Sequence, residues 1–312
     1  MQFGKYRFKC TLEREAYFPP YKGSTFRGGF GHALKQVVCT VRHKECAECL
    51  LSERCLYSRV FENGPLGKPS PKHIAHPPRP YVIEPPPETK CHYLVGESFD
   101  FNLILFGEYN DYLPYFVYAF ELMGQKGLGK KIDGRRATYV LSSIESEDRQ
   151  IYSSQDQRLA TDFCSRKITL EEPALPLQTG TLEILLKTPL RLKFENHLQA
   201  QLPFSLVVRA MLRRISALFE AYGDGEPELD YRGLVERSKH IEIFSEDLAW
   251  YDWQRYSNRQ EAKMLMGGMS GSVTYQGCLG EYLPLLELCR EFHLGKQTAF
   301  GLGNFDFHWS PA

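Results

Sequence analysis

The chain has 312 residues, of which 43% are hydrophobic and 24% charged, so it can bury a large core in one or two domains. It has no apolar run of about 18 residues, as a membrane span requires, and its first residues lack the apolar core of a secretory signal. The formal net charge is zero, which excludes a uniformly basic nucleic-acid binder but allows local patches. We therefore expect a cytoplasmic protein with no membrane partner.

The first predicted elements are a strand and a helix. Residues 6–13 alternate as a strand, and FPPYKGSTFRGGFGHALKQVV (18–38) predicts a turn and then a helix capped by Ser24 or Thr25. On the helical wheel, Gly28, His32 and Lys35 share the side opposite the apolar residues. A glycine inside a helix costs about 1 kcal/mol relative to alanine. The glycines here therefore indicate close approach of either another backbone or a nucleic-acid strand.

A cysteine-rich segment follows this helix. In a chain without a secretory signal, nine cysteines favour metal or thiol chemistry over disulfides. Four of them have the spacing C-x6-C-x2-C-x5-C, namely Cys39, Cys46, Cys49 and Cys55. Four thiolates predict a closed structural zinc site, and an iron–sulfur cluster is the alternative because it takes the same ligands. His43 could replace one of the cysteines.

The chain also contains a repeat. Residues 103–129 and 273–303 each have a short apolar strand, the tripeptide Tyr-Leu-Pro, a stretch of helical length and then Gly-Leu-Gly before a strand. Each half begins with a strand and a helix, so both halves have the order of a βαββαβ unit. We predict an α+β protein of tandem ferredoxin-like domains with a small cysteine-rich insertion. The expected boundaries are 1–145 for the first domain with its insertion at 39–60, 146–175 for a linker or insertion, and 176–312 for the second domain.

The two glycine-rich loops of this repeat carry the first candidate RNA contacts. Backbone N–H groups in such a loop can approach phosphates closely, although a glycine-rich segment also forms a tight helix-to-strand turn. Cations near these loops and on the predicted helices within 18–38 and 203–223 add positive charge. The segment YDWQRYSNRQ mixes arginines with aromatic residues that could stack on bases. The cluster from Lys126 to Arg136 holds five cations against one acid, Asp133. The residues expected to bind RNA are Arg27, Lys35, Lys126, Gly127, Gly129, Lys130, Lys131, Arg209, Arg213, Arg255, Arg259, Gly295, Lys296, Gly301 and Gly303.

Two histidines are candidates for catalysis on RNA. Cleavage through the 2′-hydroxyl of RNA needs a base, an acid and cations, and it requires no metal ion. His32 would lie beside the bare patch of the first helix, with Tyr21 and Lys22 nearby. His293, at the start of the terminal glycine loop (293–303), is the rival candidate.

These segments together resemble a known family. PPYKGSTFRGGFGHAL, followed by CTVRHKECAECLLSERCLYSRVFE, is similar to the N-terminal region of CRISPR-associated endoribonucleases that process precursor crRNA, in the branch with a four-cysteine segment. HPPRPYVIEPP, LKTPLRLKF and HLGKQTAFGLGNF resemble further blocks of this family in the same order. The family belongs to the RAMP superfamily, whose mark is a glycine-rich loop late in a ferredoxin-like domain.

The resemblance implies a metal-independent endoribonuclease that cuts CRISPR repeat RNA and leaves a 5′-hydroxyl and a 2′,3′-cyclic phosphate. It maps the family's catalytic histidine to His32 and its glycine loop to Gly295, Gly301 and Gly303. The implied partners are repeat RNA, crRNA and subunits of a CRISPR effector complex. Two alternatives stay open: a crRNA-binding RAMP subunit that does not cleave, and a redox protein with an iron–sulfur site.

Overall fold

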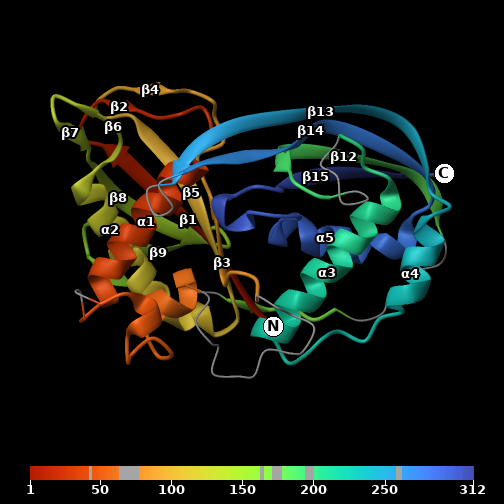
Figure 1. Ribbon diagram of the computed structural model, residues 1–312, viewed down its shortest axis with the longest axis horizontal. Helices are drawn as coiled ribbons and strands as arrows, with labels where there is room; N and C mark the ends of the chain where they lie inside the picture. The colour runs from red at the N-terminus through yellow and green to blue at the C-terminus, as the bar shows by residue number, and fades with distance from the viewer. Residues whose placement is uncertain (42–43, 63–76, 162–164, 171–177, 194–199, 258–261) are drawn as a thin grey trace. The chain divides into compact units, whose positions relative to one another are not determined.

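The computed structural model describes all residues of the chain except 42–43, 63–76, 162–164, 171–177, 194–199 and 258–261. The chain divides into two compact units (Figure 1). Unit 1 consists of Met1–Ile168 with Ala221–Asp224, and unit 2 of Thr169–Glu220 with Gly225–Ala312. Among the described residues, no helix is both long enough and apolar enough to span a membrane.

Unit 1 is built on one large antiparallel sheet. Its strands are β1 (Gln2–Leu12), β3 (Tyr81–Glu84), β5 (Ser98–Phe106), β8 (Tyr139–Ser146), β9 (Arg149–Ser153), β10 (Arg158–Leu159) and β11 (Arg166–Lys167). Their order is β10-β9-β8-β1-β5-β3, and β11 pairs with β1. Two small sheets accompany it, β2 (Ala16–Tyr17) with β4 (His92–Tyr93), and β6 (Leu128–Ile132) with β7 (Arg135–Ala137).

Two helices bury an aromatic core against this sheet. They are α1 (Gly23–Val38) and α2 (Leu113–Lys126), and shorter helical turns cover Cys46–Glu48, Ser58–Glu62 and Gly107–Tyr112. The ring of Phe30 on α1 stacks on Phe120 of α2 at 4.6 Å, and Phe8 of β1 stacks on Phe101 of β5 at 4.9 Å. Each fully buried aromatic side chain contributes about 2–3 kcal/mol of transfer free energy, so this cluster fixes α1 on the sheet.

Unit 2 also packs helices on an antiparallel sheet, which is smaller than the sheet of unit 1. Its elements are β12 (Thr179–Leu190), α3 (Phe204–Tyr222), α4 (Tyr231–Ser238), β13 (Glu242–Ser257), β14 (Ala262–Cys278), α5 (Leu283–Phe292) and β15 (Phe305–Pro311), with helical turns at Gly280–Tyr282 and Thr298–Phe300. The strand order is β13-β14-β12-β15, and β13 with β14 forms the long hairpin drawn in blue in Figure 1.

The two units share one topology. Numbered within each βαββαβ unit, the strands β8-β1-β5-β3 and β15-β12-β14-β13 both have the spatial order 4-1-3-2. Both second helices, α2 and α5, carry the proline of Tyr-Leu-Pro in their first turn, where its missing N–H costs no hydrogen bond. The α+β fold with two ferredoxin-like units, expected from the internal repeat, is confirmed.

Two details differ from the sequence-based expectations. Helix α1 begins at Gly23 and has Lys22 as its N-cap, with no side-chain cap, so the expected caps Ser24 and Thr25 lie inside its first turn. Part of the expected linker, 146–175, forms β9, β10 and β11, which extend the sheet of unit 1. Residues 149–153, 158–159 and 166–167 therefore belong to unit 1 because their backbone groups pair with β8, β9 and β1.

Candidate functional site

The exposed face of α1 carries His32. Its side chain is exposed, and a Cβ added at Gly28, one turn earlier, would meet nothing within 4 Å. Lys35 is half-buried one turn later, with its Nζ 5.5 Å from the centre of the Tyr57 ring. The structure therefore places an imidazole beside a bare stretch of helix with a cation next to it, as expected from the helical wheel.

The other two glycines of α1 serve packing. A Cβ at Gly29 would lie 2.7 Å from Leu128, and one at Gly31 would lie 2.6 Å from the Phe61 ring. Both distances are shorter than van der Waals contact. Gly29 and Gly31 therefore allow neighbours to approach the helix, and Gly28 is the glycine that leaves open surface.

Lys22 is buried in the protein and Tyr21 is half-buried. Burial, with the carboxylate of Glu84 adding to it, raises the pKa of the Tyr21 phenol, which therefore keeps its proton and is a poor base. The Lys22 side chain is fully buried, and its Nζ donates to the backbone carbonyls of Glu88 and, at 3.5 Å, of Pro20. Burial lowers the pKa of this ammonium. Lys22 thus ties the entry of α1 to the segment that precedes β4.

His293 lies in the interior of unit 2. Its relative exposure is 0%, its Nδ1 is 3.1 Å from the carbonyl oxygen of Leu302, and its Nε2 is 3.4 Å from the side-chain nitrogen of Asn304. It also occupies the left-handed region, with φ of 61°, at the end of α5. In this structure His293 closes the terminal glycine loop from inside, whereas His32 faces solvent.

The glycine-rich loops are shaped by contacts with the protein's own backbone. Gly303 has φ of 74°, and a Cβ there would lie 1.8 Å from the Leu294 carbonyl oxygen. A Cβ at Gly295 would lie 2.7 Å from the carbonyl oxygen of Arg191. The amides of Leu294, Lys296 and Gly303 donate to carbonyls within unit 2, at 2.9–3.1 Å. These N–H groups are therefore occupied by the turn.

The loop of unit 1 behaves in the same way. Gly127 and Gly129 have φ of 78° and 77°, and a Cβ on either would press on the carbonyl oxygens of Ala137 and Tyr17 at 2.8 and 2.5 Å, respectively. Of the two explanations that the sequence left open, the tight helix-to-strand turn accounts for these glycines.

Most of the cations expected to bind RNA are accessible. Arg27 is half-buried, with its guanidinium 4.9 Å from the centre of the Phe61 ring. The exposed ones are Lys126, Lys130, Lys131, Arg209, Arg213 and Lys296. Arg255 lies on β13 with its side chain outside the described part of the structure, and Arg259 lies outside the described residues altogether.

The four clustered cysteines are all half-buried free thiols. The Cys49 amide donates to the Cys46 carbonyl at 3.3 Å, which is the tight turn expected for C-x2-C. Burial raises the pKa of Cys46, and the nearby Cys55 and Cys39 add to the increase while Lys35 opposes it. Within the described ranges, no three His, Cys, Asp or Glu side chains converge on one point as a metal site requires. His43 lies outside those ranges, and zinc stays a prediction from the sequence.

Metal analysis tests this prediction. We expect about one zinc per chain after purification without chelator, because four thiolates fill a tetrahedral site. Cys46→Ser with Cys49→Ser should remove the metal, and Cys91→Ser, at an exposed cysteine outside the cluster, should retain it. Iron with visible absorbance would favour the cluster alternative, and a metal-free native protein would contradict both.

One polar cluster in unit 1 has no signal in the sequence. Nε2 of His92 lies 2.5 Å from a carboxylate oxygen of Glu15, which also accepts a hydrogen bond from the Tyr17 hydroxyl at 3.1 Å. The rings of Tyr17 and His92 stack at 4.4 Å with an angle of 12°. The hydrogen bonds from His92 and Tyr17 lower the pKa of Glu15. The cluster depends on the register of β2 with β4, in which Tyr17 pairs with His92.

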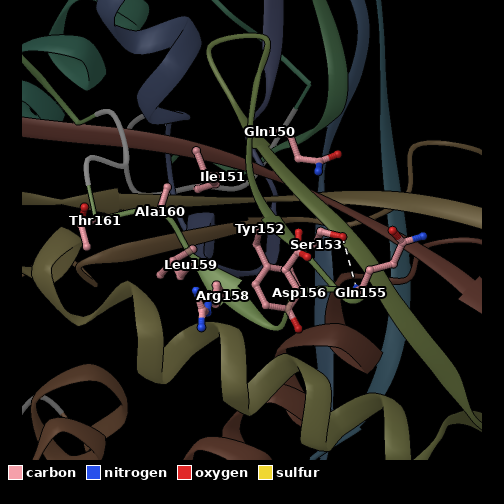
Figure 2. A pocket seen from close by; sticks show the side chains of 10 residues that line it. All are labelled: Gln150, Ile151, Tyr152, Ser153, Gln155, Asp156, Arg158, Leu159, Ala160 and Thr161. Atoms are coloured by element: carbon pink, nitrogen blue, oxygen red, sulfur yellow. Dashed lines mark hydrogen bonds between the residues drawn. The ribbon is translucent and has the colours of Figure 1, made fainter.

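Figure 2 shows a shallow hollow on the β9–β10 hairpin. One of its lining residues, Tyr152, donates a hydrogen bond to Glu121, and burial together with this bond raises the pKa of the phenol. The hollow is lined by Gln150, Ile151, Tyr152, Ser153, Gln155, Asp156, Arg158, Leu159, Ala160 and Thr161. It contains none of the predicted catalytic residues, and we assign no site to it.

Comparison with protein families gives two matches in this chain. A family model called AF_1859_N, described as an N-terminal domain, matches residues 1–163, more than half of the chain. A second model, CRISPR-associated endoribonuclease Cas6, matches residues 184–305. The chain therefore belongs to the family of the AF_1859_N domain, and its residues 184–305 match a Cas6 domain. The match to the Cas6 model confirms the resemblance to CRISPR-associated endoribonucleases seen in the sequence, and the branch with the four-cysteine segment stays a prediction.

The individual relatives of this protein have low sequence identity to it. An uncharacterized protein from Archaeoglobus fulgidus is 25% identical over 311 residues, covering 96% of each chain. A Cas6 product complex has a TM-score of 0.57 at 14% identity, covering 99% of this chain and 100% of that one. The Cas6 of Thermus thermophilus has a TM-score of 0.54 at 12% identity, covering 98% of both chains. At these identities the structures show a shared fold.

Some relatives are much longer. The partial Cas6-RT-Cas1–Cas2 complex matches with a TM-score of 0.57 at 14% identity over 99% of this chain. This chain spans only 46% of that polypeptide, and 29% of the one in the Cas6-RT-Cas1–Cas2 complex.

Proposed function

We propose that the protein is an endoribonuclease that cuts CRISPR repeat RNA in precursor transcripts, with His32 as its catalytic histidine. The observation that carries this proposal is the exposed imidazole of His32 beside the open surface at Gly28, in a chain with a Cas6 domain. The match of residues 184–305 to an endoribonuclease model supports RNA as the substrate, and a Cas6 product complex shares the fold.

The proposed chemistry uses the RNA's own 2′-hydroxyl as nucleophile. The neutral imidazole of His32 accepts the 2′-hydroxyl proton, the oxygen attacks the adjacent phosphorus, and the bond to the 5′-oxygen breaks as that oxygen takes a proton from solvent water. The products are a 2′,3′-cyclic phosphate and a 5′-hydroxyl. Because no water or metal hydroxide is the nucleophile, this route requires no metal ion. Lys35 lies one turn away, where its charge could stabilise the phosphorane.

A crRNA-binding RAMP subunit that does not cleave is the second candidate. Of the other acid–base candidates, Lys22 is fully buried and Tyr21 is half-buried with a raised pKa, and no hydrogen bond links His32 to another described residue. A lone imidazole supports binding as well as it supports catalysis.

One cleavage assay separates the two candidates. Purified protein is mixed with the CRISPR repeat RNA of its own genome in EDTA and the products are separated on a denaturing gel. A single cut that disappears when the scissile nucleotide is 2′-deoxy supports the nuclease. Tight binding without a cut supports the non-cleaving subunit, and absence of binding would contradict both.

The affinity for repeat RNA should fall steeply as salt rises. Each phosphate contact to a single strand contributes about 0.7 to the slope of log K against log salt, so four or more contacts give a slope of about 3. Fluorescence anisotropy across a potassium chloride series measures this slope. A flat response would contradict binding through the exposed cations.

A further inference from the structure

The β6–β7 hairpin of unit 1 is a concentrated positive surface. We use the name basic hairpin for four cations of this hairpin together with the last residue of α2; all five side chains are exposed, namely Lys130, Lys131, Arg135, Arg136 and Lys126. In the part of the chain that the structure describes, none of the five forms an ion pair, and Arg136 donates to the carbonyl of Gly129 at 3.3 Å. Five cations against Asp133 alone create a local field that attracts an anion although the whole chain is neutral.

The stacked Tyr17–His92 pair lies beside this hairpin. A Cβ at Gly129, the second residue of β6, would lie 2.5 Å from the Tyr17 carbonyl oxygen, so the two backbones approach at that point. Figure 1 shows β2, β4, β6 and β7 together at one end of unit 1. Tyr17 is 40% exposed, and Glu15 holds both rings in place through its two hydrogen bonds.

We propose that the basic hairpin and the Tyr17–His92 pair form one contact surface for single-stranded RNA; this inference rests on the proposed function and deepens it. Lysine and arginine side chains neutralise phosphates, and an exposed aromatic ring receives an unpaired base. Bases in a duplex are already stacked and cannot use such a ring. The surface therefore binds an unpaired stretch of the RNA in preference to a stem.

Glu15 is the positioning residue of this surface. It orients the rings before RNA arrives, which lowers the entropy lost when a base stacks on them. Its carboxylate is engaged by His92 and Tyr17, and Glu97 nearby pairs with Lys90 at 2.8 Å. These pairings leave the lysines and arginines of the hairpin as the dominant charge of the surface.

The test measures affinity of the full chain for an unstructured RNA of roughly 12 nucleotides and for a duplex of the same length. Lys130→Gln with Lys131→Gln should weaken binding to the single strand about tenfold and lower its salt slope by about 1.4, at about 0.7 per phosphate. Tyr17→Ala should weaken it about tenfold, since one stacked base is lost. Tyr17→Phe keeps the ring but loses the hydrogen bond to Glu15, so it should bind more tightly than Tyr17→Ala and slightly more weakly than the wild type.

Matched variants control for charge and folding. Arg158→Gln with Lys167→Gln removes the same charge from exposed positions on β10 and β11 and should leave affinity unchanged. Circular dichroism verifies that each variant is folded. If the hairpin and Tyr17 variants bind RNA as well as the wild type does, the proposed contact surface is refuted. The proposed function is unaffected by that result. If duplex binding falls as much as single-strand binding, the assignment to single strands is wrong. If the wild type binds no repeat RNA, the proposed function itself fails.

Discussion

His32→Ala is expected to lower the rate of repeat-RNA cleavage by about 10²- to 10⁴-fold, the usual contribution of one general acid or base. The side chain is exposed on α1 and makes no contact that the core requires, so folding should be unaffected. Affinity for the RNA should change little, because the substitution removes the group that transfers the proton and leaves the RNA-binding cations in place. Single-turnover cleavage at saturating protein measures the effect apart from binding.

Two further variants make this result specific. Gln36→Ala removes an exposed side chain one turn along the same helix and should cleave at the wild-type rate. His293→Ala removes a buried ring together with its contacts to Leu302 and Asn304, so its primary effect should be lower stability of unit 2. If folded His293→Ala loses cleavage while His32→Ala retains it, the assignment of the catalytic histidine is reversed.

The fold could be predicted because its signals are local and occur twice. Tyr-Leu-Pro marks the start of α2 and α5. Gly-Leu-Gly lies directly after α2 and at the end of the loop that follows α5, and in both copies its glycines have positive φ angles. Two copies in the same order imply two copies of one unit. The wheel of α1 likewise placed His32 and Gly28 on an exposed face, because helical periodicity depends on spacing alone.

The site itself could be predicted only in part, because the burial of a side chain depends on tertiary contacts, which residue spacing does not reveal. Lys22 and His293 have residue types suited to catalysis, yet their surroundings come from Glu88 in one case and Leu302 in the other. The stacked pair of Tyr17 and His92 arises from strand register across 75 residues of chain (92 − 17). Spacing patterns carry no information about such pairs.

Gly303→Ala is expected to lower the free energy of unfolding by about 3 kcal/mol. A left-handed φ costs a residue with a Cβ about 1–2 kcal/mol, and relief of the contact with the Leu294 carbonyl requires a shift of the loop. That shift would strain two backbone hydrogen bonds, from Leu294 to Gly303 and from Gly303 to Pro189, at 2.9 and 3.1 Å. Urea denaturation measures the change.

Gly28→Ala is the matched control, since the same atom is added at a glycine with open surroundings. Helix propensity predicts a gain of about 1 kcal/mol, because the new methyl group meets nothing within 4 Å. If RNA crosses α1 at this point, the methyl group should weaken RNA binding while it stabilises the protein. A loss of stability in Gly303→Ala and a gain in Gly28→Ala would show that the fold requires Gly303 and that Gly28 is available to contact RNA. If Gly303→Ala were as stable as wild type, the terminal loop would have room to move, and backbone packing would not explain its glycines.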